Sequence, residues 1–257
     1  MEFFIICISA VVASFLTLFS GFGLGTLLMP VFAIFFPVNV AIALTAIVHL
    51  FNNLFKLALL GKYANRTIVF RFGLPAIGAT FLGAWTLLYL SELRHLVTYQ
   101  IAGHSFQITP VKLIVSILMV FFALLELIPR FEMISFEKKY LPLGGVMSGF
   151  FGGLSGHQGA LRSAFLIKAG LSKEGFIGTG VVIACIVDIT RISIYSSQLL
   201  FIGISDNSIL LLAAVISAFI GAFIGNRLVK KITMRVIQII VSVMLFGIAL
   251  GLGTGLI

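Results

Sequence analysis

The stretch GGLSGHQGALRSAFLIKAG, residues 152–170, places a histidine, a glutamine and an arginine inside an otherwise apolar run. Each glycine in a helix interior costs about 1 kcal/mol relative to alanine, so a cluster of glycines predicts a break in the helix. A second cluster, SGFGLGTLLMP at 20–30, interrupts the first apolar run in the same way. Backbone groups that such breaks leave free need protein, water or ligand partners at membrane depth. The two clusters therefore predict two broken, re-entrant helix hairpins, at 3–36 and 141–168.

The composition is that of a membrane protein. Of the 257 residues, 60% are hydrophobic and only 10% are charged, whereas a typical globular domain has about 25% charged residues. Outside the hairpins, apolar runs of the length that a bilayer requires recur along the chain. We predict membrane helices at 38–60, 68–91, 111–128, 175–195, 208–228 and 236–256. The predicted fold class is an all-α polytopic membrane protein. Because Cys7 and Cys185 both lie in apolar runs, a disulfide framework and a CxxC metal site are excluded.

Basic residues are distributed unevenly among the connections between these segments. Three, three, two and four Lys or Arg residues lie in 61–71, 129–141, 168–174 and 227–235, respectively. The other connections carry only Arg94 and Lys112. The positive-inside rule then places the four basic connections in the cytoplasm, provided that each hairpin returns to the side from which it enters. We therefore predict a multi-pass protein of the cytoplasmic (inner) membrane with both termini extracytoplasmic.

This topology inverts the two halves of the chain relative to each other. We predict a first repeat at 1–128 and a second repeat at 129–257, each made of one hairpin followed by three transmembrane helices. The sequences GATFLGAW and GAFIGNRL match between the halves, and the helix after each hairpin carries a threonine, Thr45 in AIALT and Thr179 in GFIGT. Inverted repeats with interrupted helices are typical of secondary transporters, which hold their substrate near the membrane midplane. Channels share some of these features.

The paired glycine-rich hairpins, each followed by AIALT or GFIGT, resemble the sulfite exporter TauE/SafE family over nearly the whole chain. The resemblance implies a membrane transporter of sulfite, organosulfonates or related small anions. The polar residues of the second motif, GLSGHQGALRS, are then candidates for tuning the substrate.

Arg162 in this motif is the first candidate for substrate binding. An arginine at the centre of a bilayer costs about 3 kcal/mol on insertion scales, so it normally faces the protein interior or a wet cavity. Its planar guanidinium can bind two oxygens of a sulfite or sulfonate group. His157 and Gln158 can donate hydrogen bonds to the same ligand, and His157 can exchange a proton near neutral pH. The alternatives are that Arg162 pairs with Asp188 or with helix carbonyl groups, and that His157 only binds backbone.

In VHLFNNLFK, residues His49, Asn52, Asn53 and Lys56 recur at helical spacing and form one polar stripe, which we expect to face the protein interior. We predict that Asn52 and Asn53 bind substrate, while His49 and Lys56 set the field of the site or take part in coupling. Hydrogen bonds that only join neighbouring helices are the alternative.

Two further groups complete the predicted site. Asp188 and Arg191 lie three residues apart, so we expect an intrahelical pair that also sets the field or couples to protons. Thr45 and Thr179 are predicted to bind the anion through their hydroxyl groups, unless these bond to their own helix carbonyls. Asp188 is the only carboxylate that we expect to be buried, which disfavours a cation carrier.

The sequence thus predicts a secondary transporter that exports a small sulfur oxyanion by alternating access. It has no Walker-type loop, HExxH motif or recognisable Ser/His/Asp grouping, so neither an ATP-driven pump nor a protease is expected, nor any other enzyme. We expect no cofactor and no metal. A small anionic substrate and membrane lipid are the expected partners, and a homodimer is compatible with the sequence. Nucleic acid is not expected, because topology and lipid headgroups account for the net charge of +9. An anion channel and a non-transporting membrane scaffold subunit are the alternatives.

Overall fold

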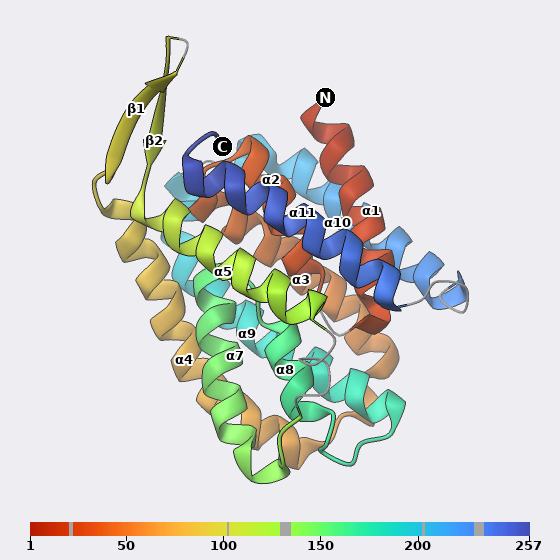
Figure 1. Ribbon diagram of the computed structural model, residues 1–257. Coiled ribbons are helices and arrows are strands. Elements are labelled where there is room, and N and C mark those ends of the chain that lie inside the picture. The colour runs from red at the N-terminus through yellow and green to blue at the C-terminus, as the bar shows by residue number, and fades with distance from the viewer. Residues whose placement is uncertain (21–22, 102, 129–134, 202–203, 229–233) are drawn as a thin grey trace.

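The computed structural model describes residues 1–20, 23–101, 103–128, 135–201, 204–228 and 234–257, and helices dominate them (Figure 1). The first half of the chain forms α1 (Glu2–Ser20), α2 (Leu24–Phe35), α3 (Val38–Leu60), the short 3-10 helix η1 (Gly61–Tyr63), α4 (Arg66–Glu92), β1 (Val97–Ile101), β2 (His104–Ile108) and α5 (Pro110–Leu127). The second half forms η2 (Lys138–Tyr140), α7 (Leu141–Ser155), α8 (Gly159–Leu166), α9 (Lys173–Phe201), α10 (Ile204–Leu228) and α11 (Met234–Thr254). Arg130, Lys230 and Lys231, which belong to the predicted cytoplasmic connections, lie outside the described residues.

Local sequence signals explain where several of these helices begin and end. Asn65 caps α4, because its side chain accepts a hydrogen bond from the backbone N–H of Ile68 at 3.1 Å. Thr109 caps α5 in the same way, at 3.3 Å from the backbone nitrogen of Lys112. Helix α7 ends at Gly156, whose φ of 81° lies in the left-handed region that favours glycine. The glycine cluster thus ends one helix, and α8 begins three residues later.

A two-stranded antiparallel hairpin, β1–β2, occupies the connection between α4 and α5, although the predicted all-α fold contains no strand. Its strands alternate polar and apolar residues around a turn that contains Gly103, with a φ of 82°. The hydroxyl group of Tyr99 in β1 donates a hydrogen bond to the carbonyl oxygen of Thr254 at the end of α11. Figure 1 shows the hairpin at the same end of the molecule as both chain termini.

The outer surface of the helices is apolar. Large hydrophobic side chains are exposed along α4 and α10, among them Phe81, Trp85, Ile216 and Ile220. Such a surface is suited to lipid rather than to water. Five of the described helical segments are long and apolar enough to cross a membrane. They comprise α3 with η1, the whole of α4 and of α5, and the larger parts of α9 and α10. The expectation of an all-α polytopic membrane protein is therefore confirmed, with the small β hairpin as an addition.

Helices of one half pack mainly against helices of the other half. Helix α1 packs on α10, α4 on α7, α3 on α9 and α5 on α11. In the two predicted repeats, α1 corresponds to α7, α3 to α9, α4 to α10 and α5 to α11. Replacing each helix of the four packed pairs by its counterpart gives the same four pairs again. The division into two inverted repeats remains a prediction, and this pairing is what an internal two-fold relation would produce.

The contact between α4 and α7 is made backbone against backbone. A methyl group added to Gly145, Gly149 or Gly153 of α7 would lie 2.1, 2.5 or 2.3 Å from a carbonyl oxygen of α4. Helices α1 and α10 approach each other in the same way, since a methyl group on Gly221 would lie 2.2 Å from the carbonyl oxygen of Val11. Small residues thus hold one arm of each hairpin against the opposite half.

The broken ends of the two hairpins meet inside the protein. A methyl group on Gly25, in the first turn of α2, would lie 3.4 Å from the carbonyl oxygen of Gly156, and 3.9 Å from the side chain of Thr45 on α3. The polar residues of α3, α8 and α9 surround this meeting point.

Candidate functional site

The polar stripe of α3 faces the interior, as the sequence predicts. His49 and Asn53 are four residues apart, as are Asn52 and Lys56, so the four side chains share one face of α3, and all four are buried. Because α3 packs against α9, the stripe comes into contact with the polar residues of that helix.

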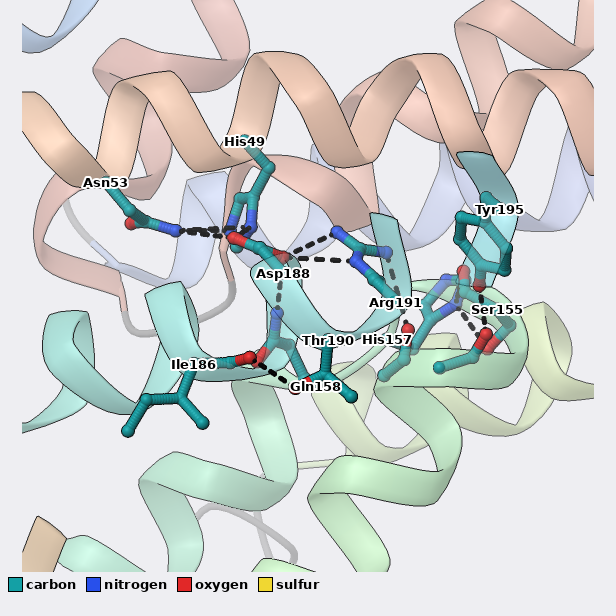
Figure 2. Close-up of polar contacts among 12 residues, drawn as sticks. His49, Asn53, Ser155, His157, Gln158, Ile186, Asp188, Thr190, Arg191 and Tyr195 are labelled. Atoms are coloured by element: carbon teal, nitrogen blue, oxygen red, sulfur yellow. Dashed lines mark hydrogen bonds and ion pairs between the residues drawn. The ribbon is translucent and has the colours of Figure 1, made fainter. Parts of the chain in front are cut away.

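Asp188 of α9 is the centre of a hydrogen-bonded cluster (Figure 2). One carboxylate oxygen lies 2.6 Å from Nδ1 of His49 and accepts a hydrogen bond from the Asn53 amide at 3.2 Å. The other oxygen accepts hydrogen bonds from Nη2 and Nε of Arg191, at 2.8 and 3.1 Å, and from the Gln158 amide at 3.1 Å. The carboxylate therefore joins α3, α9 and the turn of the second hairpin.

The intrahelical pair of Asp188 and Arg191 is confirmed, and both side chains are fully buried. Arg191 also donates a hydrogen bond from Nη1 to the carbonyl oxygen of Gly152 near the end of α7, at 3.3 Å. One turn further along α9, the hydroxyl group of Tyr195 donates to the carbonyl oxygen of Gly153. The Gly152 carbonyl also accepts a hydrogen bond from the backbone N–H of Gly156 at the end of α7. The two side-chain bonds thus fasten the last turn of α7 to α9.

Arg162 of α8 reaches the same cluster indirectly. Its Nη1 donates a hydrogen bond to Oε1 of Gln158 at 3.2 Å, while the amide of Gln158 donates to Asp188. Among the described residues Arg162 forms no direct ion pair. The pairing with Asp188 that the sequence left open is thus replaced by a contact through Gln158, and the Asp188 charge is balanced at close range by Arg191.

A small cavity of about 50 Å³ lies beside this cluster, which is room for a few water molecules. Arg162 of α8 and the side chains of His49, Asn53 and Lys56 of α3 line it, together with Gly23 from the start of α2. None of the described residues that line the cavity is acidic. Two cationic side chains therefore face one small space that contains no carboxylate.

Other predicted site residues lie outside the lining of this cavity. The Thr179 hydroxyl accepts a hydrogen bond from the backbone nitrogen of Asn65 at 2.9 Å, which fixes the start of α4. The Asn52 amide oxygen accepts one from Ser14 of α1 at 3.1 Å. The Thr45 hydroxyl is buried without a hydrogen-bond partner among the described residues.

His157 faces α5 rather than the cavity. Its ring stacks on Phe122 with centroids 5.1 Å apart, and its Nδ1 lies 3.1 Å from the carbonyl oxygen of Ser155. Its Nε2 atom is buried without a hydrogen-bond partner among the described residues. Gln158 does not line the cavity either, but it bridges Arg162 and Asp188 and so orients the arginine that does.

Sequence reasoning missed one buried carboxylate. Glu126 of α5 is 3% exposed, so the expectation that Asp188 alone is buried is wrong. Glu126 is the second-to-last residue of its helix, where a glutamate is ordinarily taken to reach the membrane surface. In the part of the chain that the structure describes, no group of three His, Cys, Asp or Glu side chains could hold a metal ion.

Comparison with known proteins agrees with this architecture. The profile of the family described as sulfite exporter TauE/SafE matches residues 6–252, which includes the second hairpin and all but the first few residues of the first. No match to a curated protein was found. On the strength of a match over nearly its whole length, the chain belongs to the sulfite exporter TauE/SafE family of membrane transporters.

Proposed function

We propose that the protein exports a small sulfur oxyanion, sulfite or a short organosulfonate, across the cytoplasmic membrane by alternating access. The observation that carries the proposal is the cavity that Arg162 and Lys56 share without an acidic neighbour. Two buried cationic groups attract an anion strongly, because the low local dielectric screens their charge less than water does.

The surrounding contacts leave these two charges available for a ligand. Asp188 is paired with Arg191, so it does not neutralise Arg162 directly. Gln158 holds the Arg162 guanidinium through one nitrogen, at 3.2 Å, which leaves further donors of the guanidinium for oxygens of an anion.

The first hairpin adds a further attraction for negative charge. Gly23 is the N-cap of α2 and lines the cavity, so the positive end of that helix dipole lies beside Arg162. A broken helix whose N-terminus points at an anionic group is a recurring arrangement in secondary transporters. The small volume of the cavity favours a compact oxyanion such as sulfite over longer sulfonates.

The pairing of helices between the halves supports alternating access. Each hairpin arm packs on the opposite half, α1 on α10 and α7 on α4, while the broken ends meet at the cavity. Tilting one half against the other would open the cavity first to one side of the membrane and then to the other.

A thermal-shift titration tests the proposal. Purified wild-type protein and the variants Arg162→Ala, Lys56→Ala and Lys168→Ala are titrated with sulfite, thiosulfate, short sulfonates, sulfate, carboxylates and chloride. Lys168 is exposed and lies six residues beyond Arg162, so its variant is the matched control for loss of a positive charge. Ligand at one hundred times its Kd stabilises the folded state by about 2.7 kcal/mol.

We expect wild type and Lys168→Ala to shift selectively with sulfite or a related oxyanion, and both cavity variants to lose the shift while remaining folded. An unchanged shift in Arg162→Ala would contradict the assigned site. If no anion shifts the wild type, the carrier proposal fails. Counterflow in proteoliposomes then separates a carrier, which exchanges labelled for unlabelled anion, from a channel, which does not.

A further inference from the structure

Glu126 is a buried carboxyl group far along the chain from the residues of the anion cavity. It lies on α5, and this helix packs against α11. Its side chain is 3% exposed, and Oε2 has no hydrogen-bond partner among the described residues. No ion pair of Glu126 occurs within that part of the chain either.

Two hydrogen bonds define how α11 lies against this group. Arg235 donates from Nη1 to the carbonyl oxygen of Leu127 at 2.8 Å, and Ser242 donates to the carbonyl oxygen of Ala123 at 3.1 Å. The two helices are therefore antiparallel here, and the buried residue Gln238 of α11 lies at the level of Glu126. Among the described residues of α11, Arg235 carries the charge at this end of the helix. Its guanidinium donates to the backbone of α5 rather than to the Glu126 carboxyl group.

The same face of α5 touches the second hairpin. Phe122, one helical turn before Glu126, stacks on His157. His157 directly precedes Gln158, which holds Arg162. The packing of α5 is thus linked, through Phe122 and His157, to the turn that positions the cavity arginine.

A carboxylate in such surroundings needs a positive partner or a proton. Burying an ionised carboxylate without a partner costs several kcal/mol, whereas a carboxylic acid is neutral and far less costly to bury. Ionisable residues inside a membrane protein that serve only packing are rare for this reason.

We propose that Glu126 is a proton-binding site, separate from the anion cavity, that holds a proton while α5 and α11 pack together and releases it when they separate. Binding converts the carboxylate to a carboxylic acid and release returns one proton to water, so no other reactant takes part. In the transport cycle, which rests on the proposed function, this site couples the movement of the anion to that of a proton.

Infrared difference spectroscopy tests the proton site without any transport measurement. Spectra of the wild type in lipid are recorded across a pH titration and compared with Glu126→Gln, which mimics the neutral acid, and with Glu92→Gln. Glu92 is exposed at the end of α4, so its variant is the control for loss of a surface carboxyl group. We expect a carbonyl band of a protonated carboxylic acid at neutral pH, lost in Glu126→Gln, kept in Glu92→Gln and removed at high pH.

Absence of this band from the wild type at neutral pH would overturn the proposal, as would its persistence in Glu126→Gln. If Glu126→Gln does not fold, Glu126→Met provides a neutral side chain of similar length. Among the residues whose side chains the structure describes, the other Asp and Glu carboxyl groups are exposed or, in Asp188, paired with arginine. Absence of the band from the wild type therefore overturns the proposal even if neither variant folds.

Proteoliposomes with a pH-sensitive dye inside test the coupling. We expect sulfite movement by the wild type to be accompanied by proton movement, and Glu126→Gln to lose the proton signal while keeping its thermal shift with sulfite. A proton signal that is unchanged in Glu126→Gln would overturn the coupling role. If no anion is bound or moved at all, the proposed function fails, whereas the infrared band still reports whether Glu126 holds a proton.

Discussion

The Asp188 carboxylate accepts hydrogen bonds from Asn53, Gln158 and Arg191 and contacts His49, so one side chain joins both halves of the protein. Replacing it by Asn keeps the shape but removes the charge that balances Arg191. Loss of one partner of a buried ion pair costs about 3–5 kcal/mol, because the other charge remains buried. We expect Asp188→Asn to lower the free energy of unfolding by about this amount, measured by chemical unfolding in detergent.

A double variant provides the control for this prediction. Arg191→Met in the Asp188→Asn background removes the charge that was left unpaired, so part of the stability should return. If the double variant is no more stable than the single one, the ion pair is not the reason for the loss.

At the scale of single residues, the sequence predicted which side chains are buried better than it predicted what they touch. The rarity of charges inside membrane segments correctly identified Arg162 as inward-facing, and the helical spacing of the polar stripe did so for Lys56. Helical spacing alone could not reveal that Thr179 binds the backbone of Asn65 or that His157 stacks on Phe122, because both contacts join residues distant in the sequence. Glu126 was missed because its position near a helix end suggests the membrane surface.

At the scale of elements, the contact of α7 with α4 depends on glycine. A methyl group on Gly149 would lie 2.5 Å from the carbonyl oxygen of Ala76, whereas one on Gly78 of α4 meets nothing within 4 Å. We expect Gly149→Ala to lower the free energy of unfolding by about 3 kcal/mol or more, because the helices must move apart. We expect Gly78→Ala to be neutral or to stabilise the helix by up to about 1 kcal/mol.

Unfolding of both variants in the same detergent measures this difference. Equal stability of the two variants would show that α4 and α7 can separate without cost, and would contradict the backbone contact. The pair is matched, since each change adds one methyl group to a helix interior.

The glycine clusters allowed the hairpins to be predicted, since few features other than a broken helix explain so many glycines in an apolar run. The β hairpin escaped prediction because its strands are short and polar residues alternate in them without a buried face. Its position is fixed by contacts of Tyr99 and Gln107 with the end of α11, which no local pattern contains.

At the scale of the whole molecule, the orientation in the membrane that the charge distribution predicts can be tested by labelling. Single cysteines are placed at Ser105 in the β hairpin and at Lys62 after α3, both exposed, in a background in which Cys7 and Cys185 are replaced by Ala. We expect a membrane-impermeant maleimide to label the Ser105→Cys protein in intact cells. The Lys62→Cys protein should react only after the membrane is opened. The opposite pattern would reverse the predicted topology, and labelling of both in intact cells would contradict it.

Because one helix of each hairpin packs on the opposite half of the chain, the order in which the helices are synthesised affects folding. Helix α1 packs on α10, which begins at Ile204, so its partner leaves the ribosome about 200 residues later. At about 5–20 residues per second, α1 waits roughly 10–40 s in the translocation channel or in lipid before this contact can form. Neither half completes its packing alone, and biogenesis therefore requires that the first hairpin be sheltered until most of the second half has been inserted.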